Sequence, residues 1–189
     1  MKPADLSGLT SATTCANLAR LAATVPKSRA ILEIGTFRGK SACALASKAK
    51  GHVWTIDPWD LEGNIKGKHD FNNPALREVF AYQVDACGLS DKITHIKGFS
   101  PQVASDWDGP AIGLIFLDGD HEYESIVADF AAWQDKLTDG AGNSKPAVVV
   151  FDDLDTPRNP GVRQFFDEVA LDNKRQLKDN LGVGEYVGG

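Results

Sequence analysis

The stretch Ile31–Ser41, which reads ILEIGTFRGKS, decides the fold class of this chain. It begins with an apolar run of strand length, in which Glu33 stands shortly before a turn at Gly35, and a helical pattern starts near Lys40. A strand that passes through a glycine turn into a helix is the beginning of a cofactor-binding βαβ unit. The stretch therefore predicts a nucleotide-type cofactor at the turn.

The glycine spacing disfavours a pyrophosphate ligand. A P-loop needs one more residue between its two glycines than the three that separate Gly35 from Gly39. The dinucleotide fingerprint fails as well, because Phe37 stands where a second glycine would let the backbone approach the phosphates. Asp57 follows Gly35 by about 20 positions, the distance at which an acid reaches a ribose hydroxyl. We therefore expect an adenosine cofactor without a phosphate tail.

Apolar runs of strand length alternate with helical patterns along the chain. This alternation predicts an α/β fold, with a doubly wound, Rossmann-like and mostly parallel sheet that is covered by helices on both faces. The expected strands are Ala30–Gly35, Val53–Asp57, Ile93–Gly98, Ile112–Asp118 and Ala147–Asp152. The expected helices are Leu9–Thr24, Lys40–Ala49, Pro74–Gly88, Ser125–Leu137 and Val162–Ala170. The segment Asp60–Asn73 is a candidate lid, because it follows the carboxyl end of a strand, and Asp139–Pro146 reads as a Gly-rich loop.

The composition limits the possible partners. The chain has 26 acidic and 20 basic residues and no basic run, so we expect no nucleic-acid partner. The three cysteines, Cys15, Cys43 and Cys87, are far apart and form no Cys-x-x-Cys pattern, which disfavours a disulfide framework or a zinc site and fits a reducing cytoplasm. The N-terminus lacks the apolar core of a signal peptide, and no run of ~18 apolar residues occurs. We expect a soluble cytoplasmic protein without a membrane partner.

The ordered set of motifs resembles the class I S-adenosylmethionine-dependent methyltransferases over about residues 30–154. The glycine turn departs from the usual Gly-x-Gly-x-Gly form and is similar to the variant of the macrocin O-methyltransferase-like branch, whose members modify sugars of macrolides and related natural products. IDPW at Ile56–Trp59 and LDGDH at Leu117–His121 also match that branch. The resemblance implies a single methyltransferase domain over residues 1–189. Because little chain remains after Leu154, the antiparallel strands that end this fold should be short or incomplete.

The resemblance also implies how S-adenosylmethionine is bound. The first strand and the glycine turn would hold the methionine end, and Asp57 would take both ribose hydroxyls. In the loop after the third strand, Phe99 could cover the adenine face and the Ser100 hydroxyl could bond its edge, although Ser100 before Pro101 is equally well explained as a helix N-cap. The residues expected to bind the cofactor are Glu33, Gly35, Thr36, Phe37, Gly39, Ser41, Asp57, Phe99, Ser100 and Asp118. In the simpler alternative, the glycines only form the turn and Asp57 only caps it.

Carboxylates end the fourth and fifth expected strands, at Asp118 and at the pair Asp152 and Asp153. These strands are neighbours in the sheet order of this fold, so the three side chains should converge. Carboxylates that lie close together repel one another unless a cation lies among them, and oxygen ligands with open water positions suit Mg²⁺. Metal-dependent O-methyltransferases of the catechol and macrocin-like branches carry the same pattern. It implies a divalent cation that binds vicinal oxygens of the acceptor and lowers the pKa of the hydroxyl to be methylated. Turn-forming aspartates without an ion are the alternative.

The expected general base is His121. It follows Asp118 by three residues, where related metal-dependent O-methyltransferases carry their base, and an imidazole pKa of ~6.5 suits proton abstraction near neutrality. Asp120 is the rival, because some macrocin-like members use that acid. In a third interpretation, His121 is only a residue at the start of a helix that bonds to a neighbouring loop.

The sequence thus predicts metal-assisted O-methyl transfer from S-adenosylmethionine to a small-molecule hydroxyl, on a sugar, a natural product or another vicinal diol. A homo-oligomer is possible. Two other classes stay open: a P-loop-like kinase or ATPase, and a non-catalytic module that binds S-adenosylmethionine.

Overall fold

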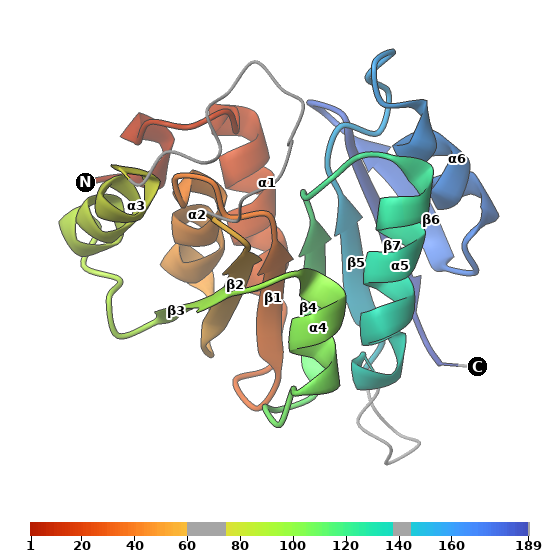
Figure 1. Ribbon diagram of the computed structural model, residues 1–189, viewed down its shortest axis with the longest axis horizontal. Helices are drawn as coiled ribbons and strands as arrows, with labels where there is room; N and C mark the ends of the chain where they lie inside the picture. The colour runs from red at the N-terminus through yellow and green to blue at the C-terminus, as the bar shows by residue number, and fades with distance from the viewer. Residues whose placement is uncertain (60–74, 138–144, 189) are drawn as a thin grey trace.

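A single seven-stranded sheet organises the chain. The computed structural model describes residues 1–59, 75–137 and 145–188, and the strand order in these residues is β3-β2-β1-β4-β5-β7-β6 (Figure 1). The strands are β1 (Ala30–Ile34), β2 (Val53–Asp57), β3 (Ile93–Lys97), β4 (Ile112–Leu117), β5 (Ala147–Phe151), β6 (Asp172–Leu177) and β7 (Leu181–Tyr186). The first five are parallel, and β7 pairs antiparallel with both β5 and β6. The predicted fold class is confirmed.

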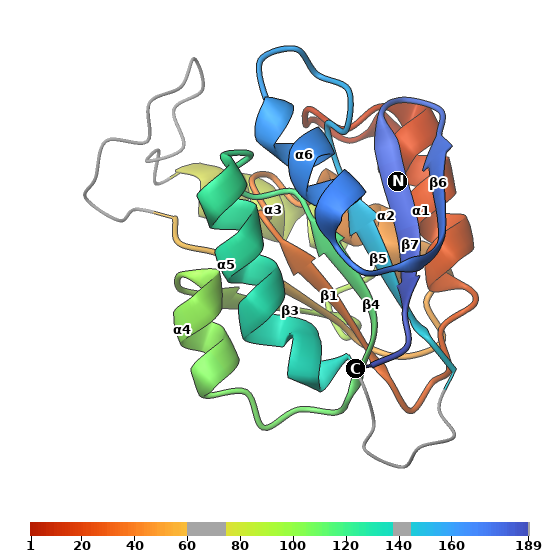
Figure 2. The same ribbon diagram turned by 90° about the vertical axis from the view of Figure 1, so that its right-hand side faces the viewer.

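Helices cover both faces of the sheet (Figures 1 and 2). One face carries α1 (Ala12–Ala22), α2 (Lys40–Lys48) and α3 (Ala75–Ala86), and the other carries α4 (Ser100–Ser105), α5 (Tyr123–Trp133) and α6 (Pro160–Glu168). Two short 3₁₀ helices are η1 (Pro3–Asp5) and η2 (Gln134–Lys136). Successive residues of a strand point to opposite faces, so Ile31 packs on the first side and Leu32 on the second. This two-sided burial explains why the central strands read as continuous apolar runs.

The C-terminal strands are fuller than expected. Both β6 and β7 have six residues, and they complete the sheet. The sequence of β6, Asp-Asn-Lys-Arg-Gln-Leu, gives no apolar alternation because it is an exposed edge strand, and charged side chains on such an edge discourage pairing with other chains. The connecting turn has positive φ at Asp179 and Asn180 (61° and 59°), as tight hairpins require.

Other differences from the sequence analysis are local. The first helix begins at Ala12, because the hydroxyl of Ser11 caps it by accepting the Thr14 amide at 3.0 Å. The short helix α4 was not among the expected helices. The candidate lid Asp60–Asn73 and most of the loop Asp139–Pro146 lie outside the described residues. None of the described helices is long and apolar enough to cross a membrane.

The end of β1 meets the end of β4 through a glycine. The Asp118 amide donates to Ile34 O, and the Gly35 amide donates to Ile56 O, each at 2.9 Å. Gly35 has φ +94°, and a Cβ at this position would lie 1.9 Å from the Asp118 carbonyl oxygen. Two backbone segments therefore touch where only a residue without a side chain fits.

We predict that Gly35→Ala destabilises the fold by about 3 kcal/mol or more, because backbone must move as well as adopt a strained φ. Gly88→Ala is the matched control, since Gly88 also has positive φ (+66°) but open space around its Cβ position. Its cost should be limited to the left-handed strain of about 1–2 kcal/mol. Urea unfolding of both variants checks this, and equal losses would contradict the contact described.

Candidate active site

The candidate site lies at the carboxyl edge of the parallel strands. Strand order reverses between β1 and β4, and ligands of open α/β sheets bind outside the strand ends at such a switch point. Gly35, Asp57, Asp118 and Asp152 directly follow or end β1, β2, β4 and β5. The structure therefore brings the two predicted groups of functional residues, the cofactor turn and the strand-end acids, to one edge.

Asp57 holds the glycine turn in shape. Its Oδ2 accepts the backbone amides of Thr36 and Phe37, both at 2.9 Å, and its Oδ1 accepts the Trp59 amide at 3.0 Å. Phe37 has φ +46°, and its carbonyl accepts the Trp59 indole N–H at 3.1 Å. The amides that a P-loop would give to a phosphate are thus bound to a carboxylate. This geometry gives no support to a kinase or ATPase.

Glu33 lies behind the turn, fully buried in β1. Thr55 donates its hydroxyl to Oε2, the Ser41 hydroxyl also bonds the carboxyl group, and Oε1 has no partner among the described residues. Burial raises the pKa of Glu33 to about 7, the two hydroxyl bonds oppose this, and the Asp57 charge adds to it. Thr36 and Ser41 are buried too, and the Thr36 hydroxyl bonds that of Thr55. These predicted cofactor-binding side chains therefore form a polar network beneath the turn.

The loop after β3 carries the two residues expected beside the adenine. Phe99 is 51% exposed, which is unusual for a large apolar side chain and fits a stacking surface. Ser100 is buried, and its hydroxyl accepts the Trp133 indole N–H at 2.9 Å and bonds Asp129. The N-cap interpretation of Ser100 is wrong, because α4 begins at Ser100 and its N-cap is Phe99, without a side-chain capping bond.

Asp118 and Asp152 form a carboxyl pair across β4 and β5. Their side chains lie within hydrogen-bonding range of each other. Burial first, and then the charges of neighbouring acids, raise the pKa of both groups far above the usual aspartate range. A second way to neutralise such a pair is to place a cation between the oxygens.

His121 is held between this pair and the next loop. Its Nε2 lies 3.7 Å from Asp118 Oδ1, and its Nδ1 lies 3.8 Å from Asp153 Oδ2. The Asn159 amide nitrogen lies 3.1 Å from both Nδ1 and Asp153 Oδ2. Because the carboxylate can only accept, the amide donates to both groups, and the proton of a neutral imidazole is then on Nε2. Asn159 is a site residue that the sequence analysis missed, since a polar residue before Pro160 looks like an ordinary helix cap.

The remaining acids point elsewhere. Asp153 has φ +52°, and its two oxygens accept the Thr156 hydroxyl (2.9 Å) and the Asn159 amide. Asp120 is exposed, and it accepts the Ser125 hydroxyl at 2.9 Å and the Glu122 amide at 3.3 Å, so its side chain is bound to residues at the start of α5.

The predicted metal ligands converge only in part. Among the described residues, no group of three or more His, Cys, Asp or Glu side chains is arranged to hold a metal ion. Asp118 and Asp152 do fit a hard divalent cation, because both offer oxygen and they repel each other when ionised. Asp153 instead presents its oxygens to its own loop.

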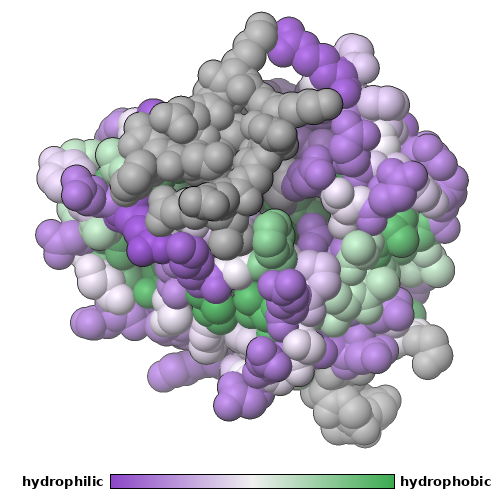
Figure 3. Space-filling view, in the orientation of Figure 1, coloured by the Kyte–Doolittle hydropathy of each residue, from purple (hydrophilic) through white to green (hydrophobic). Residues whose placement is uncertain are grey.

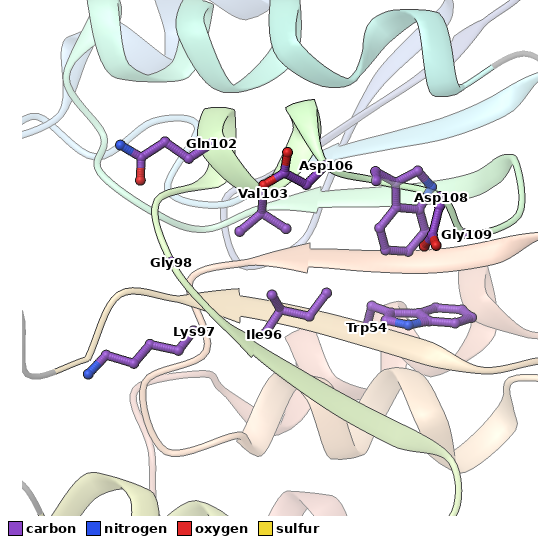
Figure 4. A pocket seen from close by; sticks show the side chains of 10 residues that line it. Trp54, Ile96, Lys97, Gly98, Gln102, Val103, Asp106, Asp108 and Gly109 are labelled. Atoms are coloured by element: carbon purple, nitrogen blue, oxygen red, sulfur yellow. The ribbon is translucent and has the colours of Figure 1, made fainter.

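A separate cavity lies between α4, the loop that follows it, and strands β2 and β3. It measures about 510 Å³, Ile96 of β3 faces Val103 of α4 across it, and Trp54 of β2 lies farther along the sheet (Figure 4). Figure 3 shows hydrophobic surface on this face of the molecule. Neither Asp118 nor His121 lines the cavity, so we do not assign it to the reaction.

The sheet order and the turn held by a strand-end acid define the architecture of the Rossmann-like methyltransferases. The chain belongs to the methyltransferase domain family, whose model matches residues 32–154. The match includes the glycine turn, Asp57, His121 and all three strand-end acids. The match does not show whether the chain belongs to the macrocin-like branch.

Solved structures share the fold at low identity. The cofactor-bound Rv0187 protein from MTB aligns with a TM-score of 0.70 and 22% identity, over 98% of this chain and 85% of that one. The Bacillus cereus O-methyltransferase in complex with SAH gives 0.67 and 19%, over 94% and 82%. The O-methyltransferase TomG of Streptomyces achromogenes, in complex with SAM, gives 0.64 and 21%, over 95% and 82%. No curated protein sequence is significantly similar to the chain.

The raised pKa of Glu33 predicts a pH-dependent stability. Between pH 4.5 and about 7, Glu33 keeps its proton in the folded protein but loses it in the unfolded chain. Its contribution to the unfolding free energy therefore falls as pH rises through this window. From pH 5 to pH 8, the unfolding free energy of wild type should therefore fall by about 2 kcal/mol relative to Glu33→Gln. Denaturant melts at both pH values measure this. Glu78→Gln, at an exposed position on α3, is the control, and its unfolding free energy should change with pH as in wild type. If Glu33→Gln also shows the wild-type pH dependence, Glu33 does not have the raised pKa described here.

Proposed function

We propose that this protein transfers a methyl group from S-adenosylmethionine to a hydroxyl of a small molecule. Family membership and the neighbours that bind SAM or SAH support the methyl donor. The observation that carries transfer to oxygen is the position of His121, whose ring is bracketed by Asp118 and Asp153 at the cofactor edge. A module that only binds the cofactor has no need of this cluster.

The cofactor occupies the crevice beside the glycine turn in this proposal. Asp57 uses Oδ2 for the turn amides and one lone pair of Oδ1 for the Trp59 amide, and the remaining lone pair of Oδ1 accepts a ribose hydroxyl. Gly35 fixes the shape of the turn that holds the methionine end, and Phe99 supplies a face for the purine. The acids at the strand ends favour the positive sulfonium centre by charge.

The chemistry needs an ionised acceptor oxygen. The acceptor hydroxyl gives its proton to His121 Nε2, the oxygen forms a bond to the methyl carbon, and the carbon–sulfur bond breaks with its electrons left on sulfur. In the tautomer described above Nε2 carries the ring proton, so Nε2 can accept a proton only after the ring proton moves to Nδ1, where Asp153 Oδ2 lies 3.8 Å away. A divalent cation bound at Asp118 and Asp152 would lower the pKa of the acceptor hydroxyl. Asp120, which is bonded to Ser125 at the start of α5, is the weaker candidate base.

A vicinal diol is the acceptor class we favour, because two adjacent oxygens suit a site built from paired carboxylates and a cation. Sugars and catechols both belong to this class. The described cysteines are free thiols, which agrees with our proposal that the reaction takes place in the cytoplasm.

Cofactor binding can be tested without an acceptor. Calorimetry should show that S-adenosylhomocysteine binds wild type and that Asp57→Asn weakens binding about tenfold or more, since charge-assisted bonds to the ribose and the turn are lost. Asp91→Asn, an exposed aspartate before β3, is the matched control and should bind like wild type. Unchanged affinity in Asp57→Asn would refute the ribose assignment.

Two variants should distinguish the role of the cation from the role of the base. Mn²⁺, followed by electron paramagnetic resonance, should bind wild type and His121→Ala, but at least about tenfold more weakly to Asp152→Asn. With a catechol or deoxysugar glycoside found by screening, transfer should stop in EDTA and fall by about 10²–10⁴-fold in His121→Ala. The exposed Asp167→Asn on α6 serves as control. Full activity in EDTA would remove the cation from the mechanism, and a dead Asp120→Asn beside an active His121→Ala would make Asp120 the base.

A further inference from the structure

One partly buried acid, Asp129, has no role so far. Asp129 lies in the middle of α5, on the sheet face that also carries α4, and the two helices lie side by side (Figure 2). Burial raises its pKa to about 6, although the Ser100 hydroxyl bonds it. No basic side chain of the described residues pairs with it. A partly buried carboxylate without a cation is costly for the fold and needs an explanation.

The carboxylate lies between the two loops that follow β3 and β4. On one side, it bonds Ser100, the first residue of α4. On the other side, its Oδ2 lies 3.6 Å from the position that a Cβ on Gly119 would occupy. Gly119 follows Asp118 and lies against Ile34 at the end of β1. Asp129 therefore lies between the start of α4 and the loop after β4, and Gly119 has no side chain that would cover Oδ2 from that side.

The purine of the proposed cofactor should lie beside these two loops. A ribose held at Asp57, the end of β2, places the base toward the neighbouring strand β3, where Phe99 exposes half of its surface beside Ser100. The loop from Gly98 to Pro101 contains no acid that could accept a hydrogen bond from the base. The Ser100 hydroxyl is already engaged with Trp133 and Asp129. Asp129 supplies the acceptor that this loop lacks.

We propose that Asp129 is a specificity-determining residue that accepts a hydrogen bond from the exocyclic amino group of the cofactor's adenine. The site then selects purines that carry a 6-amino group. A carboxylate can accept several donors, so the bond from Ser100 orients the group and leaves lone pairs for the base. Trp133 also helps to fix Ser100, because its indole N–H donates a hydrogen bond to the Ser100 hydroxyl oxygen. This inference rests on the proposed S-adenosylmethionine site.

The test compares two ligands that differ only in the amino group: S-adenosylhomocysteine and its analogue with an unsubstituted purine. Calorimetry should show that wild type prefers the amino ligand by about tenfold or more, as expected for a hydrogen bond to a charged acceptor. In Asp129→Ala the preference should fall to about onefold. Asp129→Asn keeps the shape of the side chain and a neutral carbonyl acceptor, so it should retain an intermediate preference. This conservative variant keeps the test valid if Asp129→Ala does not fold. Glu124→Ala, at an exposed position on the same helix, should keep the wild-type preference.

The outcomes separate the possible failures. If Asp129→Ala weakens both ligands by the same factor, the carboxylate only ties α4 to α5, and the inference is overturned while the cofactor site stands. An equal affinity of wild type for the two ligands overturns it as well. If wild type binds neither ligand, the proposed function itself is wrong, and the role of Asp129 falls with it.

Discussion

The approach of two backbone segments at Gly35 and Asp118 is the constraint on which the site depends. A side chain at position 35 would overlap the Asp118 carbonyl, so the cofactor turn and the strand-end acid are placed by one contact between chains that are distant in sequence. The parallel register of β1 and β4 brings the two ends level, and the bond from the Asp118 amide to Ile34 O fixes them. The geometry of the crevice follows from this contact more than from any side chain within it.

The site edge gathers carboxyl groups at some cost to stability. Glu33, Asp118, Asp129 and Asp152 all have raised pKa values, and burial is the largest cause for each. Such groups destabilise a folded protein when they ionise without a partner. A positive sulfonium, a divalent cation or a donor amino group would relieve this repulsion, so ligand binding and folding should reinforce each other. The buried acids at this site therefore favour the binding of cationic or hydrogen-bond-donating ligands.

The sequence predicted the elements whose pattern is local. Five strands were found to within a residue because most are buried, largely apolar runs, as in β4 and β5, and the fold class followed from their alternation with helices. The exposed strand β6 escaped, because its pairing with β7 leaves no mark on its polar sequence. Position along a motif also does not show where a side chain points: Ser41 lies at the start of α2, directly after the expected turn, and its hydroxyl bonds the buried Glu33 carboxyl group. The partners of His121 and Ser100, namely Asn159 and Asp129, come from distant segments and emerge only when the chain is folded.

The sheet order has a consequence for the order in which the site is assembled during synthesis. Strand β7 lies beside β5 although β6 precedes it in the chain, and the hairpin turn at Asn180 accepts the Leu154 amide at 2.8 Å, just after Asp152 and Asp153. Because domains tend to fold as their segments emerge from the ribosome, the cofactor turn between β1 and β4 can form well before this hairpin is made. The loop that carries the two acids gains its support only once the hairpin has been synthesised. A nascent chain would thus acquire the cofactor-binding half of the crevice before the half that holds these acids.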